Sequence, residues 1–362
     1  MSEEKPTQDR LRVLVVDDSA YNRQTITAML ETLPGVRVVG RATNGKEALR
    51  LVFDLEPDVI TLDLEMPEMD GFAFLRLLMH KRPTPVLVVS GYAQRENVFR
   101  ALELGALDFI AKPSRDVTPD LRSIEHELTS KISLVRRLQI VRVRERARAL
   151  ARLPGAPAEP LDIDPVAPRS IIAIAASTGG PPAVQQLLGA LPATLPTALL
   201  VAQHMPARFT RAFAERLDRL VPMHVAEAED GQLLVAGTAY IAPGAAHFEI
   251  ADSPLGPIAR IHSPSSVAVG AVLPSADRLF RSVAAIYGPR MCAVVLTGMG
   301  ADGKEGVRVA KAAGARVLAE DPRTAVMPGM PQSAIATGNV DEVTPLEGMA
   351  AAIVRFVESL NG

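Results

Sequence analysis

The sequence predicts an α/β fold made of two doubly wound parallel sheets, each covered by helices on both faces. Short apolar runs such as LRVLVV, DVITL and PVLVVS alternate with longer segments of helical period from residue 11 to about 131. The same alternation resumes at Ser170 with SIIAIAA, TALLVAQH and CAVVLTG. Uninterrupted apolar runs of this length are typical of parallel strands that are buried on both faces. The length of 362 residues also exceeds what one core usually serves, which favours two domains.

The segment between the two alternating regions has a different composition. ISLVRRLQIVRVRERARALAR is helix-forming and strongly basic, and LPGAPAEPLDIDPVAPRS, with five prolines, follows it. This pattern indicates a helical connector and a semi-rigid linker. We expect a flavodoxin-like first domain over residues 1–130, a linker over 131–169 and a Rossmann-like second domain over 170–362. In the second domain, TAYIAPGAAHFEIAD and PIARIH are predicted to pair as shorter strands in a hairpin insertion.

Composition restricts the environment and the partners. The 39 Lys and Arg residues nearly balance the 41 Asp and Glu residues, so no overall field attracts nucleic acid or an acidic membrane. The single cysteine, Cys292, sits in the apolar run MCAVVL and is predicted to be a buried structural thiol. The sequence has no signal-peptide core and no apolar stretch near the roughly 18 residues that a membrane helix needs. We expect a cytoplasmic protein without direct membrane insertion.

Polar residues end the predicted strands of the first domain. Asp17 and Asp18 end the first strand and Asp63 ends the third. Ser90 ends the fourth strand and Lys112 ends the fifth. The carboxyl ends of the strands line one crevice in a doubly wound sheet, so we expect these side chains to converge. Three carboxylates together require a cation, and Mg²⁺ prefers such ligands, while the hydroxyl and the ammonium suit a phosphoryl group. A cap or turn role would explain one aspartate alone, but it explains the whole set poorly.

A serine ends the first strand of the second domain, in the segment ASTGGPP. Ser177 precedes Thr178 and Gly179 at a predicted helix start, where backbone N–H groups and the helix dipole favour an oxyanion. The same turn would suit a phosphate, but the Gly-Lys-Ser/Thr ending of a phosphate loop and a GxGxxG pattern are both missing here. Ser177 is therefore a candidate nucleophile, and a nucleophilic serine needs a general base.

A base and its partner are available at two other strand ends. His204 in VAQHMP ends the next strand, and sequential strands in such sheets are usually neighbours. Asp302 in LTGMGADG follows a third strand, where a carboxylate can fix the tautomer of the imidazole. For the competing histidine, His247 in APGAAH, we expect a structural or substrate-edge role. The sequence thus predicts a triad of Ser177, His204 and Asp302.

The first domain resembles the receiver domain of bacterial response regulators over residues 11 to about 130. The resemblance is carried by VVDDSAYNR, LDLEMPEMDG, the strand-end Ser90 and AKP. It implies that Asp63 accepts a phosphoryl group from a histidine kinase, and that Asp17 and Asp18 hold Mg²⁺ together with Asp63. It further implies that Ser90 moves to contact the phosphoryl group and that Lys112 binds it.

The second domain resembles the catalytic domain of the protein-glutamate methylesterase of bacterial chemotaxis, the CheB family. ASTGG, QHMP, APGAAH, PSADRLFRSVA and LTGMGADG are similar to its motifs and occur in the same order. The resemblance implies the triad named above, with Thr178 and Met299 on the oxyanion side and no cofactor for the hydrolase. It also implies a phosphorylation-controlled enzyme that demethylates glutamates of methyl-accepting chemotaxis receptors, deamidates receptor glutamines and receives phosphoryl groups from the chemotaxis histidine kinase.

Two other function classes remain open from the sequence. One is a signalling adaptor whose second domain only binds receptors, but the intact triad argues against it. The other is a transcription factor, because the connector from Lys131 to Arg152 has eight basic residues against one acidic residue. No aromatic or polar recognition helix follows this connector, so a solvated helix explains its charge better.

Overall fold

The computed structural model describes residues 10–91, 95–113, 121–135, 166–263 and 272–360. The chain forms two compact units, Met1–Ala147 and Arg148–Gly362, and each has its own parallel sheet. The predicted α/β class with two doubly wound sheets is confirmed. Most of the predicted linker, residues 136–165, lies outside the described residues. No helix in the described part of the chain is long and apolar enough to cross a membrane.

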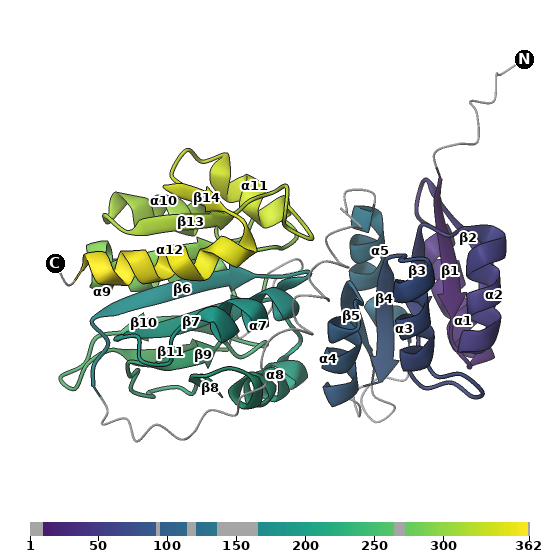
Figure 1. The fold of residues 1–362 in the computed structure, drawn as a ribbon, viewed down its shortest axis with the longest axis horizontal. Helices are drawn as coiled ribbons and strands as arrows, with labels where there is room; N and C mark the ends of the chain where they lie inside the picture. Colours follow the sequence, from purple (N-terminus) through teal and green to yellow (C-terminus); the bar gives the residue numbers. More distant parts are fainter. Residues whose placement is uncertain (1–9, 92–94, 114–120, 136–165, 264–271, 361–362) are drawn as a thin grey trace, which may run out of the picture. The chain divides into compact units, whose positions relative to one another are not determined.

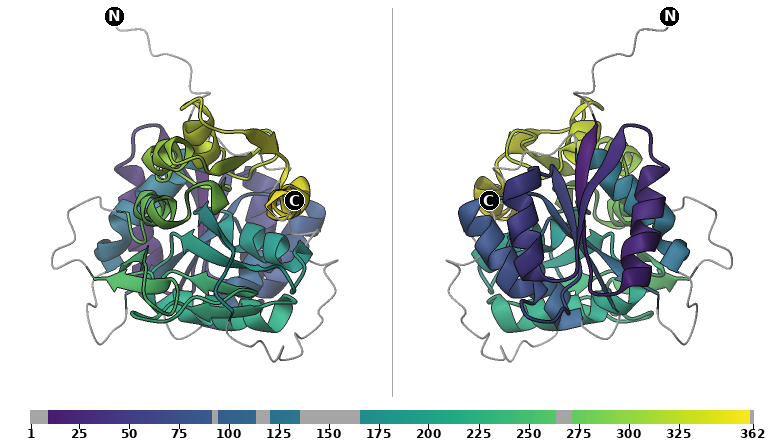
Figure 2. Two further views of the ribbon diagram at one scale, coloured as in Figure 1. Left: turned by 90° about the vertical axis from the view of Figure 1, so that its left-hand side faces the viewer. Right: turned by 90° about the vertical axis from the view of Figure 1, so that its right-hand side faces the viewer.

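The first unit is built on a five-stranded sheet. Its elements are β1 (Leu11–Val16), α1 (Ala20–Glu31), β2 (Val36–Ala42), α2 (Gly45–Leu55), β3 (Val59–Leu62), α3 (Gly71–Lys81), β4 (Val86–Gly91), α4 (Arg95–Glu103), β5 (Asp108–Lys112), the short 3₁₀ helix η2 (Leu121–Ile124) and α5 (Glu125–Leu134). The strand order is β2-β1-β3-β4-β5, that of flavodoxin-like folds, and all neighbours are parallel. Helices α1 and α5 cover one face and α2 and α3 cover the other, as Figure 2 shows.

Local sequence explains where these helices begin. Ser19, Asn44 and Asp70 precede α1, α2 and α3, and each side chain accepts a hydrogen bond from the backbone N–H three residues later. At the other end of the unit, Lys131 donates to the backbone oxygen of Phe109 at 2.6 Å. The last helix of the first unit, α5, ends at Leu134, so the first residues of the predicted linker, 131–134, are helical.

The second unit is built on a seven-stranded sheet (Figure 1). Its elements are β6 (Ser170–Ala176), α7 (Gly180–Ala190), β7 (Thr197–Gln203), α8 (Ala207–Leu220), β8 (His224–Glu227), β9 (Thr238–Ile241), β10 (His247–Ala251), β11 (Ile258–His262), α9 (Ala276–Tyr287), the 3₁₀ helix η4 (Gly288–Arg290), β12 (Met291–Val295), α10 (Lys304–Ala312), β13 (Arg316–Glu320), α11 (Gly329–Ile335), β14 (Glu342–Thr344) and α12 (Leu346–Ser359). The order is β14-β13-β12-β6-β7-β9-β8, and all neighbours are parallel. Helices α7, α8 and α12 cover one face, and α9 and α10 cover the other.

Burial follows the composition of the strands in the second unit. Strands β6, β7 and β12 are buried along their full length, which explains why their sequences are continuous apolar runs without alternation. Cys292 lies in β12 with none of its surface exposed, and burial raises the pKa of its thiol. The thiol is therefore a packed, unreactive group, as predicted.

The hairpin insertion is shorter than the sequence indicated. The TAYI segment forms β9 and joins the main sheet between β7 and β8, so it does not belong to the hairpin. Only β10 and β11 pair antiparallel, with His247 opposite His262. Burial alternates along β10, because Phe248 and Ile250 pack against the core beneath α9 while their neighbours face outward.

Each sheet has a topological switch point, where the chain stops adding strands on one side of its first strand and begins to add them on the other. In the first unit the chain passes from β1 to β2 on one side and returns to β3 on the other. In the second unit it passes from β6 to β7 on one side and later reaches β12 on the other. Crevices for ligands form at such switch points, outside the carboxyl ends of the strands. Asp17 and Asp63 border the first switch point, and Ser177 and the loop that carries Asp302 border the second.

Candidate functional site

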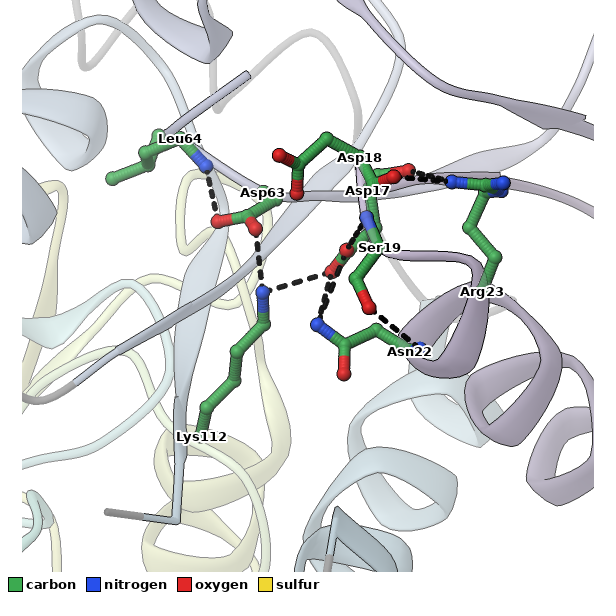
Figure 3. A network of polar contacts seen from close by, with 8 residues as sticks. All are labelled: Asp17, Asp18, Ser19, Asn22, Arg23, Asp63, Leu64 and Lys112. Atoms are coloured by element: carbon green, nitrogen blue, oxygen red, sulfur yellow. Dashed lines mark hydrogen bonds and ion pairs between the residues drawn. The ribbon is translucent and has the colours of Figure 1, made fainter. Parts of the chain in front are cut away.

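The acidic residues of the first unit converge at the carboxyl ends of β1 and β3. Asp17, Asp18 and Asp63 each offer a carboxylate oxygen, and these oxygens lie within 4.8 Å of one another. Asp17 and Asp63 are buried, whereas Asp18 is exposed. The backbone N–H of Asp63 donates to the oxygen of Val16 at 2.9 Å, which ties the two strand ends together. Figure 3 shows the carboxylates gathered near the end of the Lys112 side chain.

Lys112 partly balances this negative charge. Its ammonium lies 2.5 Å from Asp63 Oδ2 and 2.8 Å from Asp17 Oδ2 (Figure 3). Burial alone would lower the pKa of Lys112, but the two carboxylates outweigh burial and raise that pKa, so the ammonium stays charged. Burial raises the pKa of Asp63; Lys112 opposes this shift and Asp17 adds to it. One ammonium does not balance three carboxylates, and this oxygen-rich cluster fits a hard divalent cation such as Mg²⁺.

Short-range hydrogen bonds orient two of the carboxylates. Asp17 accepts the backbone N–H of Ser19 at 2.9 Å and the side-chain amide of Asn22 at 3.1 Å. Asp63 Oδ1 accepts the backbone N–H of Leu64 at 2.8 Å, which leaves its other oxygen toward Lys112. Sequence analysis did not identify Asn22. It lies in the first turn of α1, five residues after Asp17, and this spacing could have indicated the contact.

Ser90 lies beside this cluster, at the end of β4. It is 1% exposed, and the strand register pairs it with Ala111, the residue before Lys112. Ser90 and Lys112 therefore lie near the ends of neighbouring strands, at the same edge of the sheet. All five residues predicted for a phosphoryl site thus lie at one edge of the sheet.

Strands β6 and β7 bring Ser177 beside His204. The two strands pair along their full length, and their last pair is Ala176 with Gln203. Ser177 and His204 are the next residues, and the His204 N–H donates to Ala176 O at 3.0 Å. Ser177 is half-buried and the His204 side chain is 14% exposed, so a substrate can reach both. Within the described residues, no hydrogen bond joins the Ser177 hydroxyl to His204; such bonds are often long before substrate binds.

Asp302 holds the histidine from the other side. His204 Nε2 lies 2.8 Å from Asp302 Oδ2. The same carboxylate accepts hydrogen bonds at the N-terminus of α9, from the hydroxyl of the N-cap Ser275 at 3.2 Å and from the N–H groups of Ala276 at 2.7 Å and Asp277 at 3.1 Å. Burial would raise the pKa of Asp302, but the hydrogen bond and charge of His204 and the backbone N–H groups outweigh it and lower the pKa. An ionised Asp302 favours the imidazole tautomer that is protonated at Nε2, which leaves Nδ1 as an acceptor.

The residues predicted for the oxyanion side lie at the same edge of the sheet. Thr178 is 5% exposed, and Gly179 precedes α7 with φ 72°, a left-handed conformation that glycine adopts without strain. Met299 is half-buried in the loop after β12. This loop passes directly against Ser177, because a Cβ atom on Gly298 would lie 2.9 Å from Ser177 Cβ.

A buried threonine joins the loops around the serine. Thr297 accepts the Ser177 N–H at 3.0 Å through its backbone oxygen, and its hydroxyl donates to Thr178 O at 3.0 Å. Its own N–H donates to Glu320 Oε2 at 2.7 Å, and Glu320 is fully buried. Sequence analysis assigned no role to Thr297, Glu320 or Gln203. Thr297 and Gln203 stand inside the motifs LTGMG and QHMP, whereas nothing near Glu320 in the sequence signals its contact.

His247, the competing histidine, does not share the carboxylate that binds His204. It is half-buried at the start of β10, and its Nδ1 is buried without a hydrogen-bond partner. Burial first, and then the nearby Arg278, lower the pKa of His247. A neutral histidine without an orienting carboxylate is a weaker candidate for a general base.

Comparisons with known proteins find matches to both units of the chain. A family model described as CheB methylesterase matches residues 172–353, and one described as response regulator receiver domain matches residues 13–119. The chain is 49% identical over 348 residues to protein-glutamate methylesterase/protein-glutamine glutaminase 6 of Anaeromyxobacter dehalogenans, which covers 96% of this chain and 95% of that protein. It is 48% identical over 346 residues to protein-glutamate methylesterase/protein-glutamine glutaminase 1 of Myxococcus xanthus, which covers 96% and 97%.

One solved structure is similar to about half of the chain. The crystal structure of the Thermotoga maritima CheB methylesterase catalytic domain is 36% identical, covers 52% of this chain and 98% of that structure, and superposes with a TM-score of 0.49. The family match over residues 172–353 and the nearly full-length relatives lead to one conclusion: the chain belongs to the CheB methylesterase family and carries a response regulator receiver domain ahead of the catalytic domain.

Proposed function

We propose that this chain is a phosphorylation-activated protein-glutamate methylesterase that demethylates methyl-glutamate residues of chemoreceptors and also deamidates receptor glutamines. This reaction would give adaptation in bacterial chemotaxis-type signalling. Family membership and the names of the relatives support the reaction, and the receiver match supports its control by phosphorylation. The observation that carries the proposal is the 2.8 Å contact of His204 with Asp302, at the strand end next to Ser177.

Ser177, His204 and Asp302 are the proposed triad. Ser177 Oγ attacks the carbonyl carbon of the methyl ester while His204 Nδ1 accepts the hydroxyl proton. The tetrahedral intermediate then loses its methoxy group, which leaves as methanol with the proton from His204. Water, activated by the same imidazole, hydrolyses the acyl-enzyme to free glutamate and restores Ser177. When the substrate is a glutamine amide, ammonia leaves in place of methanol.

The start of α7 is the proposed oxyanion site. The substrate carbonyl oxygen becomes negative when Ser177 attacks, and the N-terminus of a helix stabilises negative charge. We assign this role to the backbone at Thr178 and Gly179, with Met299 bordering the same space. Loss of one such donor typically costs about 10² to 10³ in rate.

The acidic cluster of the first unit is the proposed control site. An oxygen of Asp63 attacks the phosphorus of the kinase phosphohistidine, and the imidazole leaves with the electrons of the P–N bond. Asp17, Asp18 and Asp63 would hold Mg²⁺, which when bound neutralises charge on the phosphoryl oxygens. Lys112 binds the phosphoryl group, and Ser90 moves to contact it.

The proposed domain limits and partners follow from this assignment. Residues 1–130 form the receiver domain, 131–169 the linker and 170–362 the catalytic domain. Methyl-accepting chemotaxis receptors are the substrates, and the histidine kinase of the pathway is the phosphodonor. We propose a cytoplasmic location, because both partners would present their reactive groups there.

The direct test is methanol release from methylated receptor membranes, measured with and without a small phosphodonor such as acetyl phosphate. We expect release above the buffer control without phosphodonor and faster release with it. Membranes whose receptors lack methyl groups are the substrate control. Absence of methanol under both conditions would reject the proposed reaction, and a rate indifferent to the phosphodonor would reject its control.

Asp63→Asn should remove phosphorylation and the activation that depends on it, while basal hydrolysis continues. The amide cannot act as the phosphoacceptor, and it does not touch the second site. Acid-labile phosphate incorporation and methanol release measure the two effects. Asp70→Asn is the matched control, because asparagine serves equally well as the N-cap of α3. A phosphoryl group mapped to Asp17 or Asp18 by mass spectrometry would contradict the assignment.

Removal of Mg²⁺ should separate the two sites. Within the described residues, the only group of three or more potential metal ligands is Asp17, Asp18 and Asp63. EDTA should therefore stop phosphorylation by acetyl phosphate and leave basal methanol release unchanged, and added Mg²⁺ should restore phosphorylation. Loss of basal hydrolysis in EDTA, reversed by metal, would mean that the hydrolase also depends on a metal ion.

A further inference from the structure

One buried amide bridges the two strand ends that carry Ser177 and His204. Gln203 ends β7, and its Nε2 donates to Ser177 O at 3.0 Å and to His204 O at 3.0 Å. The residue is 1% exposed, so water does not compete for these bonds. The two carbonyl groups also determine how the amide is turned. With nitrogen and oxygen exchanged, Oε1 would face two other acceptors.

The opposite side of the same amide differs. Gln203 Oε1 is buried and makes no hydrogen bond with the part of the chain that the structure describes. It lies against the start of α7, because a Cβ atom on Gly180 would come within 2.1 Å of it. A buried acceptor without a partner costs stability, and an apolar side chain of similar length would avoid that cost. The unpaired oxygen of Gln203 therefore calls for an explanation, and the two hydrogen bonds of its Nε2 offer one.

The bonds of Gln203 add to a backbone bond that already joins the two strand ends one residue before the serine, from the His204 N–H to Ala176 O at 3.0 Å. The Ser177 backbone is already held by its N–H to Thr297 O at 3.0 Å and by the Gly180 N–H, which donates to Ser177 O at 2.7 Å. The first bond ties the serine to the loop after β12, and the second closes the turn at the start of α7, so neither joins the serine to the histidine. The Gln203 amide donates both to the backbone of Ser177 and to the backbone of His204, so it links the position of the serine to that of the histidine.

We propose that Gln203 is a positioning residue that sets the distance and orientation between the Ser177 hydroxyl and the His204 imidazole. This inference rests on the proposed function. Because proton transfer from serine to histidine requires close alignment, a shift of about 1 Å between the two strand ends can cost about 10² in rate. Gln203 contacts neither the substrate nor the reacting atoms and acts only through the two backbones.

Gln203→Met tests the proposal in the full-length protein. Methionine has a similar length, lacks the N–H donor and removes the unpaired oxygen, so folding should be retained. We expect kcat for methanol release to fall about 10- to 100-fold with KM nearly unchanged. The Tm should shift by less than about 4 °C, the change that roughly 1 kcal/mol produces in a domain of this size. Gln186→Met is the control, because Gln186 is also buried with an unpaired amide oxygen and is bonded to neither Ser177 nor His204 in the described structure.

Gln203→Glu adds a second measurement, the pH dependence of kcat, which should not change if Gln203 has only a structural role. A protonated carboxyl group donates one hydrogen bond, whereas an ionised carboxylate donates none, and burial beside two carbonyl oxygens favours the protonated form. The ratio of kcat in this variant to kcat in the wild type should therefore rise as pH is lowered from about 8 to about 6. The same ratio for Gln203→Met should not change with pH.

Several results would overturn the proposal. These are a Gln203→Met kcat within twofold of wild type, a raised KM with unchanged kcat, and a pH-independent ratio for Gln203→Glu. A kcat loss accompanied by a Tm drop well beyond about 4 °C in Gln203→Met and a flat ratio in Gln203→Glu would show a structural role instead. Wild-type protein measured alongside separates the two claims. An inactive wild type rejects the proposed function, whereas an active wild type with an equally active Gln203→Met rejects only the role of Gln203.

Discussion

Ser177→Ala should abolish methyl ester hydrolysis and leave the fold and the phosphorylation of Asp63 intact. The hydroxyl is the proposed nucleophile, and loss of a triad member costs about 10⁴ to 10⁶ in rate. The contacts that hold the loop use the backbone of Ser177, through Thr297 and Gln203, and alanine keeps them. Methanol release measures the loss, and the Tm and acetyl phosphate labelling show that the remainder of the protein is unchanged.

Two comparisons make this result specific. Ser170→Ala removes a buried hydroxyl without a partner at the opposite end of the same strand, so its activity should match the wild type. His204→Ala should lose activity about as completely as Ser177→Ala, whereas His247→Ala should retain much of it. Near-normal turnover in Ser177→Ala would refute the proposed nucleophile, and the reverse behaviour of the two histidines would refute the proposed base.

The strand ends explain why so much of both sites could be predicted from the sequence. A buried parallel strand reads as an apolar run, and the first polar residue after the run stands at the carboxyl end, where crevices form. Asp17, Asp63, Ser177 and His204 are all such residues, and the structure places each at that edge of its sheet. The positions of these residues directly after apolar runs therefore indicated which of them lie at the same edge of a sheet.

Contacts between distant segments could not be predicted in the same way. The bond of Asp302 to the start of α9 and that of Thr297 to Glu320 depend on how helices and loops pack, not on any local pattern. The prediction that the TAYI segment belongs to the hairpin was wrong for a related reason. Both β9 and β10 read as short strands, and only their packing decides that β9 enters the main sheet while β10 pairs with β11. Nor does the sequence indicate which imidazole nitrogen of His204 faces the carboxylate.

Asp302→Asn should lower the rate of hydrolysis about 10⁴-fold, although asparagine has nearly the same shape as aspartate. The reason is the imidazole nitrogen that faces residue 302. Asp302 Oδ2 faces His204 Nε2 and accepts the Ala276 N–H, while Oδ1 accepts from three donors: the Ser275 hydroxyl and the N–H groups of Asp277 and Gly303. The amide oxygen of asparagine would keep the position among the three donors, so its NH₂ group would point at Nε2. The imidazole would then carry its proton on Nδ1, the atom proposed to accept the proton of Ser177, and the base would be blocked.

Kinetics and the state of the imidazole test Asp302→Asn together. Methanol release gives kcat, and ¹⁵N NMR should show that His204 changes from the Nε2–H to the Nδ1–H tautomer.

Asp302→Asn should also change the pH dependence of stability. Because the pKa of Asp302 is lowered in the folded protein, its contribution to stability is present at neutral pH and is lost as pH falls through that native pKa. The asparagine variant should therefore be less stable than wild type at neutral pH, with the difference shrinking in acid. Asp218→Asn is the matched control, because Asp218 forms an exposed pair with His224 at 2.8 Å, and its activity should be unchanged. If Asp302→Asn lost less than about tenfold, or kept the Nε2–H tautomer, control of the base by Asp302 would be refuted.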